Sequence, residues 1–365
     1  MRIGVLSADL THRHGWAHYS ASLIAALKRA GADVRAVTTT DSPPCGALEA
    51  ARLLPPVDPM GRGLLVRMAA AFPAARAYLS DCDVIHALIE PFAPLASWIA
   101  ADRPLFVTAH GSYIRADMAY PRWSQPIYAA ALRRGTLIAV SRYTAEIAQG
   151  ILPGVRAAII PNGVDVERFA GIERTTGHPP TALFVGAVKA RKGVHILIRA
   201  MARVRESIPD ARLLIVGSPD AEPDYAAAAR RLVDELELAD AVTFAGRVSD
   251  TELIRAYSQA DVFALPSMNA GWKFEGFGLA LLEAAAAGLP VIGSRGCGAA
   301  DAVQDGVTGL LIEQGDVQGL ADALIRLLRD RDLARRMGAV GRAFAQMHTW
   351  DAAAERLLAL YEAAR

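Results

Sequence analysis

Short apolar runs alternate with helical patterns along almost the whole chain, and this alternation restricts the fold more than any other feature of the sequence. In the first half the apolar runs lie at 2–7, 33–38, 83–88, 105–109, 136–140 and 157–160. Runs that are apolar at every position are typical of parallel strands buried on both faces, with the helical stretches between them as crossovers. The sequence therefore predicts an α/β protein.

The alternation restarts after a polar stretch at 168–180, which contains Gly and Pro and is the best linker candidate. Further apolar runs follow at 181–186, 211–216, 241–245 and 261–265. A chain of 365 residues exceeds the usual limit of one hydrophobic core. We therefore expect two doubly wound domains that face each other across a cleft. They would comprise residues 1–165 and 166–345, with a final helix at 346–365 that crosses back to the first domain.

The composition argues against several classes of protein. A formal net charge of +1 gives no case for nucleic acid. The three cysteines, Cys45, Cys82 and Cys297, show no metal-ligand spacing, which fits a reducing compartment. No apolar run approaches the length of a membrane span, so we expect a cytoplasmic protein. The helical stretch at 63–79 carries arginines among apolar residues; it either packs on the sheet or makes a peripheral contact at the inner face of a membrane.

The stretch at 275–290 reads as a binding loop followed by a short alanine-rich helix. Gly276 and Gly278 permit a close backbone approach to a ligand, and the helix points its positive end to the same place. Glu275 and Glu283 flank this loop and the start of the helix. Because a strand ends just upstream, at 265, the loop is expected at the carboxyl edge of a parallel sheet, where open α/β folds bind ligands.

A basic turn at 186–193 follows a strand in the same predicted domain. It carries Lys189, Arg191 and Lys192 after Gly186. Arginine offers a planar fork for phosphate oxygens and lysine a compact charge, so the turn suits a diphosphate. A solvated basic turn is the alternative, and the position at the end of a strand favours the binding function.

Together, these motifs resemble glycosyltransferase family four. The resemblance rests on Glu275-Gly276-Phe277-Gly278-Leu279 with Glu283 eight positions after the first glutamate, and on the segments at 266–267, 288–291 and 305–316. The segments at 161–165 and 350–361 are similar too. Membership implies the GT-B architecture of two Rossmann-like domains. It also implies retaining, metal-independent transfer from a nucleotide-diphosphate sugar, which serves as co-substrate without any further cofactor.

The resemblance also implies roles for individual residues. In the second domain Lys192 would bind the diphosphate, Glu275 would orient the transferred sugar and Glu283 would bind the ribose. The amides of Phe277, Gly278 and Leu279 would contact the phosphates or the sugar, and the backbone of Arg247 and Val248 would meet the base. In the first domain Gly15 would lie near the donor phosphate and the acceptor, and His110 would approach the donor sugar. The acceptor would be a glycan, a lipid-linked molecule or a small molecule. Its contact residues are not carried over from the family; His14, Trp16 and His18 are candidates because they lie in and beside the loop after the first strand.

The sequence departs from the family pattern at one important position. Ala187 stands where the family commonly has an arginine, so Arg191 or Lys189 is expected to supply the second cation for the diphosphate. Two other functions stay open: a sugar-nucleotide epimerase of the same architecture, and a non-catalytic protein that binds nucleotide sugars. The spacing of Asp81 and Asp83 would suit a metal, but these residues lead directly into a buried strand, so we expect no metal site.

Overall fold

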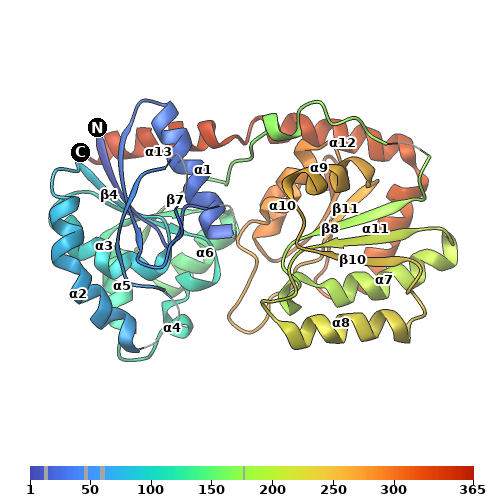
Figure 1. Ribbon diagram of the computed structural model, residues 1–365, viewed down its shortest axis with the longest axis horizontal. Coiled ribbons are helices and arrows are strands. Elements are labelled where there is room, and N and C mark those ends of the chain that lie inside the picture. Colours follow the sequence, from blue (N-terminus) through green and yellow to red (C-terminus); the bar gives the residue numbers. More distant parts are fainter. Residues whose placement is uncertain (12–14, 45–47, 58–61, 176) are drawn as a thin grey trace. The chain divides into compact units, whose positions relative to one another are not determined.

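The computed structural model describes residues 1–365 except 12–14, 45–47, 58–61 and 176. The chain divides into two compact units (Figure 1). Unit 1 comprises Met1–Gly163 together with Trp350–Arg365, and unit 2 comprises Val164–Thr349. The sequence placed the domain boundaries after residues 165 and 345, close to these positions. The predicted linker at 168–180, however, lies inside unit 2, where Phe169 is buried and the amide of Thr175 donates to the carbonyl of Ser258.

Unit 1 is built on a sheet of seven parallel strands in the order β3-β2-β1-β4-β5-β6-β7. The strands are β1 (Arg2–Leu6), β2 (Asp33–Thr39), β3 (Ala50–Leu54), β4 (Val84–Ala87), β5 (Leu105–Ala109), β6 (Thr136–Ala139) and β7 (Arg156–Ile159). The chain winds outward in one direction from β1 and in the other from β4. The switch point therefore lies between β1 and β4, where such folds bind ligands at the carboxyl ends of the strands.

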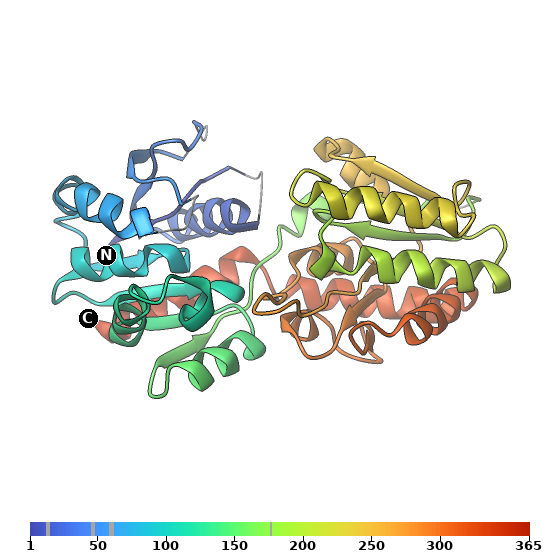
Figure 2. The same cartoon turned by 90° about the horizontal axis from the view of Figure 1, so that it is seen from below.

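Helices cover both faces of this sheet (Figure 2). They are α1 (Gly15–Arg29), α2 (Arg62–Tyr78), α3 (Ala93–Ala100), α4 (Ala116–Ala119), α5 (Gln125–Arg134), α6 (Arg142–Ile151) and α13 (Trp350–Ala364). On α2 the apolar side chains of Leu64, Leu65 and Met68 are buried. This face of the helix therefore packs against unit 1, which is the first of the two interpretations given for residues 63–79. None of the helices in the described part of the chain is long and apolar enough to cross a membrane.

Unit 2 repeats the doubly wound plan with six parallel strands in the order β10-β9-β8-β11-β12-β13. The strands are β8 (Thr181–Val185), β9 (Arg212–Val216), β10 (Val242–Gly246), β11 (Val262–Leu265), β12 (Val291–Ser294) and β13 (Gly309–Ile312). The helices are α7 (Val194–Ser207), α8 (Pro223–Glu235), α9 (Asp250–Gln259), α10 (Leu279–Ala286), α11 (Val317–Arg329) and α12 (Arg331–Gln346). Here the switch point lies between β8 and β11. The predicted α/β fold class is confirmed.

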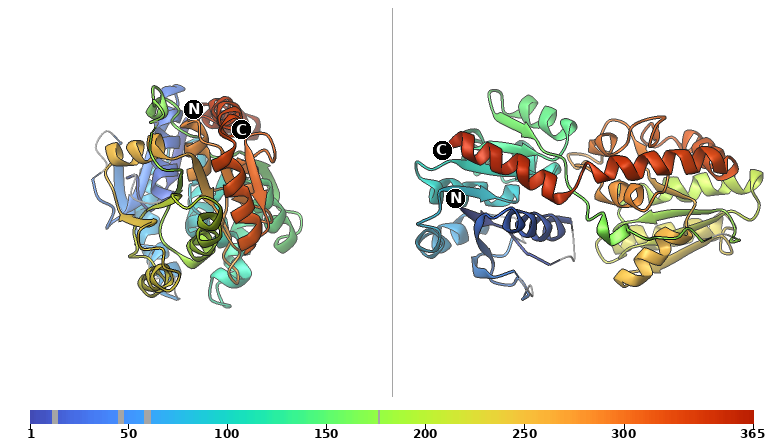
Figure 3. Two further views of the ribbon diagram at one scale, coloured as in Figure 1. Left: turned by 90° about the vertical axis from the view of Figure 1, so that its right-hand side faces the viewer. Right: turned by 90° about the horizontal axis from the view of Figure 1, so that it is seen from above.

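The C-terminal helix α13 is part of the core of unit 1, although unit 2 separates it in sequence from the rest of that unit. It packs alongside α1 (Figure 3). The buried hydroxyl of Tyr361 on α13 lies 2.5 Å from Nδ1 of His86 on β4, and Nε2 of His86 lies 2.9 Å from the hydroxyl of Thr108 on β5. Burial lowers the pKa of His86 to about 3, so the imidazole is neutral and each ring nitrogen has one partner.

Removal of the Tyr361 hydroxyl is expected to destabilise unit 1. In Tyr361→Phe, Nδ1 of the buried His86 loses its partner, which typically costs about 1–3 kcal/mol of unfolding free energy. Urea unfolding followed through hydrogen exchange of peptides from unit 1 measures this change. Tyr78→Phe is the control, because Tyr78 on α2 is exposed and a change there is expected to stay within about 0.5 kcal/mol. Equal stability of the two variants would contradict the importance of the His86 contact.

The carboxylates whose spacing would suit a metal lie at the surface of unit 1. Asp81 and Asp83 are engaged in ion pairs and hydrogen bonds: Asp81 with Arg2 and Arg35, and Asp83 with the amide of Arg2 and with Arg365. Within the described ranges, no group of three or more His, Cys, Asp and Glu residues is arranged to hold a metal ion. His14, a candidate acceptor residue, lies outside these ranges.

Candidate active site

In unit 2 the basic turn and the glutamate loop meet at the switch point. The turn follows β8 and the loop follows β11, and because these strands are parallel neighbours their carboxyl ends lie side by side. Gly193, at the end of the turn, has φ of 72°, and a Cβ at this position would lie 1.9 Å from the carbonyl oxygen of Pro266. Only glycine therefore allows the turn to approach the end of β11 so closely.

Glu275 is clamped by the two cations of this turn. Its side chain is buried, and Oε2 lies 2.5 Å from Nζ of Lys192 and 2.9 Å from Nη1 of Arg191. The hydroxyl of Ser267 donates to the same oxygen at 3.3 Å. Burial by itself would raise the pKa of Glu275, but the positive charges of Lys192 and Arg191 outweigh burial and lower it to about 2. Glu275 is therefore ionised at neutral pH and compensates part of the positive charge of the turn.

Further positive charge surrounds this clamp. The side chain of Lys189 is half-buried and makes no ion pair with any described residue, and burial together with the charge of Arg191 lowers its pKa. Lys273 also influences Lys189 electrostatically and lies on a hairpin that is tied to the turn, since the amide of Met268 donates to the carbonyl of Arg191 at 2.7 Å. With Glu275 occupied by Lys192 and Arg191, the site retains an excess of cations that suits a phosphate group.

The short helix α10 starts at this site. Gly278 is its N-cap, with a left-handed φ of 83° and no side chain to cap the amides of the first turn. Phe277 is buried beside it. Uncapped amides at a helix start favour an anion. The left-handed backbone of Gly278 is a conformation that favours glycine, and it allows the close backbone approach that the sequence predicted for this loop.

Glu283 lies one turn along α10 and has two partners that the sequence did not suggest. Tyr257 of α9 donates its hydroxyl to Oε2 at 3.0 Å, and Nη1 of Arg168 lies 3.8 Å from Oε1. Burial raises the pKa of Glu283, and the charge of Arg168 opposes this effect without overcoming it. Glu283 is thus a fixed acceptor, held in orientation from two sides.

The residues predicted to meet a base follow β10, the edge strand of the sheet. Arg247 is exposed and Val248 half-buried, directly after Gly246 and before α9. Since β10 is parallel to β9 and β8, this corner belongs to the same edge of the sheet as Gly186 and the basic turn.

In unit 1 the predicted residues gather at the switch point between β1 and β4. Gly15 is the first residue of α1 and is exposed. The ring of Trp16 lies 6.5 Å from that of His110 and 5.1 Å from that of Tyr113, measured between centroids. His18 points elsewhere, with its ring edge-on to Trp350 of α13 at 6.0 Å. The structure therefore brings Gly15, Trp16 and His110 together, and it places His18 against the C-terminal helix.

His110 is held in one orientation by its neighbours. Its Nε2 lies 2.7 Å from the carbonyl oxygen of Leu88, and the ring of Tyr19 contacts it edge-on with centroids 4.5 Å apart. Burial lowers the pKa of His110 to about 4, so the ring is neutral. A carbonyl only accepts hydrogen bonds, so the proton lies on Nε2 and Nδ1 is left as an acceptor. A neutral acceptor of this kind can receive a hydrogen bond from a sugar hydroxyl.

Several residues around the site were missed by reasoning from sequence. Arg168 and Tyr257 hold Glu283, and Glu90 accepts the amides of His110 and Gly111. Only Glu90 carried a usable signal, because it directly follows a buried apolar run and hence lies at the carboxyl edge of the sheet. Arg168 lay in the stretch interpreted as a linker.

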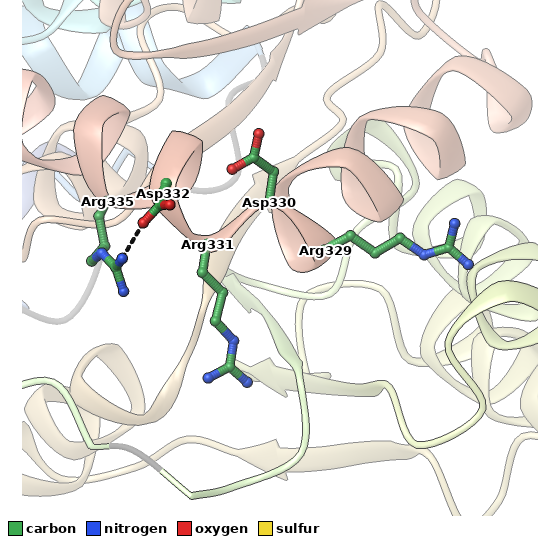
Figure 4. Close-up of a pocket in the computed structure, with 5 residues that line it drawn as sticks. All are labelled: Arg329, Asp330, Arg331, Asp332 and Arg335. Atoms are coloured by element: carbon green, nitrogen blue, oxygen red, sulfur yellow. Dashed lines mark hydrogen bonds and ion pairs between the residues drawn. The ribbon is translucent and has the colours of Figure 1, made fainter.

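A surface depression of about 580 Å³ lies at the junction of α11 and α12, away from these residues (Figure 4). Its lining consists of Arg329, Asp330, Arg331, Asp332 and Arg335. Asp330 caps the start of α12 and Asp332 pairs with Arg335. Because α11 runs back from the carboxyl end of β13, its last residue lies at the amino edge of the sheet, opposite the glutamate loop. The depression holds none of the predicted site residues.

Two family models match adjacent parts of the chain. The model described as Glycosyl transferases group 1 matches residues 165–344, and the model described as Glycosyltransferase Family 4 matches residues 14–168. The first covers the part with the glutamate loop and basic turn, and the second the part with His110. The chain is thus a glycosyltransferase by both models.

Similar proteins support this class. The GDP-mannose-dependent alpha-(1-6)-phosphatidylinositol monomannoside mannosyltransferase of Mycobacterium tuberculosis (strain CDC 1551 / Oshkosh) is 36% identical over 73% of this chain and 71% of its own length. The phosphatidyl-myo-inositol mannosyltransferase of Mycobacterium leprae (strain TN) is 34% identical over 77% and 74%. Among solved structures, sucrose-phosphate synthase from Thermosynechococcus elongatus matches with a TM-score of 0.79 at 27% identity, over 99% of this chain and 98% of that one. This likeness defines the GT-B fold class, and the chain belongs to glycosyltransferase family four.

Proposed function

We propose that this glycosyltransferase moves a sugar from a nucleotide-diphosphate sugar to a hydroxyl acceptor, with retention at the anomeric carbon and without a metal ion. The observation that carries the proposal is the clamp of Glu275 by Lys192 and Arg191 at the switch point of unit 2. Lys192 and Arg191, with the cationic excess around them, would take over the role that a metal plays at a diphosphate.

The roles in unit 2 follow from what each group offers. Lys192 and Arg191 bind the diphosphate, together with the amides of the loop at 276–279. Glu275 orients the transferred sugar by accepting its hydroxyls. Glu283, fixed by Tyr257 and Arg168, accepts from the ribose. The backbone at Gly186 approaches the phosphates, and the corner at 247–248 meets the base.

The roles in unit 1 concern the sugar and the acceptor. His110 offers Nδ1 to a hydroxyl of the donor sugar, and Gly15 leaves room beside it because it has no side chain. Trp16 lies next to His110, and we propose that its ring stacks against the acceptor. His14 and His18 are further acceptor candidates. Because the ring of His18 contacts Trp350, His18 is a weaker acceptor candidate than Trp16.

Retention follows from attack on the face that the leaving group occupies. The acceptor oxygen forms the new bond to the anomeric carbon as the bond to the phosphate oxygen breaks. That phosphate oxygen then takes the proton of the acceptor hydroxyl, so no protein base is consumed. The protein's contribution is to stabilise the charge that develops on the diphosphate.

We further propose that the donor is GDP-mannose. The support is the 36% identity over most of both chains with a relative described as GDP-mannose-dependent. The test compares GDP-mannose, UDP-glucose and ADP-glucose by thermal shift and by release of free nucleotide in the absence of acceptor. The largest shift and the fastest hydrolysis are expected with GDP-mannose. Preference for UDP-glucose would overturn the donor assignment but leave glycosyl transfer standing.

Analysis of the sugar products in these incubations, followed by incubation with a panel of acceptors, separates the two other functions. Conversion of the donor to an epimer without acceptor would show an epimerase. Tight nucleotide binding with neither hydrolysis nor transfer, across all acceptors, would show a binding protein. Either result would overturn the proposed transfer.

For the acceptor we propose a hydroxylated ring that carries a phosphate, either free or in a lipid headgroup. The support is the description of two relatives as acting on phosphatidylinositol compounds and of a third as a D-inositol 3-phosphate glycosyltransferase. A lipid acceptor would place the protein at the cytoplasmic face of a membrane, in peripheral contact through unit 1. Transfer to inositol phosphate in solution and to phosphatidylinositol in vesicles distinguishes the two sources. Transfer to neither would contradict this acceptor class.

A further inference from the structure

Glu90 is a buried carboxylate in unit 1 that accepts two backbone amides next to the candidate site. It follows β4 at the switch point and is almost completely buried, with 1% of its surface exposed. Its Oε1 accepts the amide of His110 at 2.7 Å and the amide of Gly111 at 3.2 Å. Both bonds reach across from the end of β4 to the end of β5. A single carboxylate oxygen therefore anchors the backbone amides of both His110 and Gly111.

The second oxygen of Glu90 has no hydrogen-bond partner among the described residues. The same holds for the hydroxyl of Tyr120, which is buried and interacts electrostatically with Glu90. Burying an ionised carboxylate with one unpaired oxygen is costly. A glutamine would hold the same two amides through its oxygen without a buried charge, and would instead leave its NH2 group unpaired. Hydrogen bonding to the two amides therefore does not by itself require a carboxylate.

We propose that Glu90 is a positioning residue for His110, holding the amides of residues 110 and 111 firmly when its carboxylate is ionised and more loosely when it is protonated. The inference rests on the proposed contact of His110 with the donor sugar. Gly111 contributes to this segment, because its φ of 144° is a conformation that other residues rarely adopt. The imidazole follows its backbone, since Leu88 and Tyr19 hold the ring only where residue 110 is correctly placed.

The charge of Glu90 can change near neutral pH, whereas its neighbours keep theirs. Burial raises the pKa of Glu90 to about 7, against the lowering effect of the amides that it accepts. The groups around it are His86 and His110, with pKa values of about 3 and 4, and four tyrosines. The tyrosines are Tyr19, Tyr113, Tyr120 and Tyr128, and burial raises the pKa of Tyr19, Tyr120 and Tyr128 above the ordinary value for a phenol. A change in this cluster between pH 6 and 8 therefore belongs to Glu90.

The first measurement is hydrogen exchange of the amides of His110 and Gly111 in the unliganded protein. Hydrogen bonds to an ionised acceptor are roughly twice as strong as those to a neutral one. In the wild type the protection of these amides, corrected for intrinsic exchange, should rise about tenfold from pH 6 to pH 8. In Glu90→Gln it should stay at the lower level at both pH values.

The second measurement distinguishes a positioning role from a merely structural one. Above the ordinary carboxyl pKa the buried charge weakens the fold, so Glu90→Gln should raise the Tm at pH 8 relative to the wild type. At the same pH it should lower kcat/KM for transfer, and it should remove an inflection near pH 7 from the pH profile. A purely structural glutamate would give the opposite change in Tm.

The control is Asp330→Asn, which alters a carboxylate that also accepts a backbone amide, at the start of α12. It should keep the inflection and the protection of residues 110 and 111. The inference is overturned if Glu90→Gln retains the inflection, or if its protection at pH 8 equals that of the wild type. Because exchange and Tm require no substrate, they decide the role of Glu90 even if the proposed donor proves wrong.

Discussion

Lys192→Ala is expected to lower turnover by about 10²–10³-fold at saturating donor, because loss of one preorganised contact to charge that develops in the transition state has this effect. Lys192 lies 2.5 Å from Glu275 and is largely buried, and its pKa is lowered by burial despite the attraction of Glu275. The attraction of Glu275 favours the charged form of Lys192, and only 15% of its side chain is exposed to solvent. Its charge therefore acts at close range on the leaving diphosphate.

The role of Lys192 is decided by whether the substitution lowers kcat or raises the KM for the donor. An effect on kcat with little change in KM for the donor indicates stabilisation of the transition state, whereas an effect on KM alone indicates uniform binding. Lys28→Ala is the matched control, because Lys28 is an exposed lysine at the end of α1. Near-normal turnover of Lys192→Ala at saturating donor would refute the proposed role of this lysine.

The order of the elements was accessible from sequence because each buried strand is a continuous apolar run. The strand β3 was missed. Its sequence, AARLL, lies between Pro- and Gly-rich stretches at the edge of the sheet, and only its last residue is fully buried. Pairing with β2 forms this strand, and pairing of this kind leaves no local pattern. The stretch at 168–180 was misread for a related reason, since its polar composition hid the burial of Phe169.

The candidate site was predicted in position more completely than in its interactions. That Glu275 and the basic turn share one edge of the sheet follows from their positions, because each comes after a strand of the same parallel sheet. That Arg191 and Glu275, 84 residues apart, form an ion pair depends on side-chain packing and on the close approach allowed by Gly193. Arg191 or Lys189 was expected to supply the second cation for the diphosphate. In the unliganded protein Arg191 already forms an ion pair with Glu275.

This engagement predicts how the stability of unit 2 depends on pH. The pKa of Glu275 is about 2 in the folded protein and near 4.5 in the unfolded chain. Between these values the unfolded state binds more protons, so acid favours unfolding. The stabilisation is complete above about pH 4.5 and is lost as the pH falls towards 2, and it amounts to about 3 kcal/mol of unfolding free energy.

Glu275→Gln tests this assignment, because it keeps the shape of the side chain and removes its charge. At pH 7 the variant should be less stable than the wild type, since Lys192 and Arg191 then lose their buried counter-charge. Below pH 4.5 the difference should shrink, and near pH 2 the two proteins should converge. Unfolding in urea at a series of pH values, followed by hydrogen exchange of peptides from unit 2, measures both effects. Glu235→Gln, an exposed carboxylate on α8, should follow the wild-type curve. A constant difference between Glu275→Gln and the wild type from pH 7 to 2 would show that the ionisation of Glu275 does not stabilise the fold.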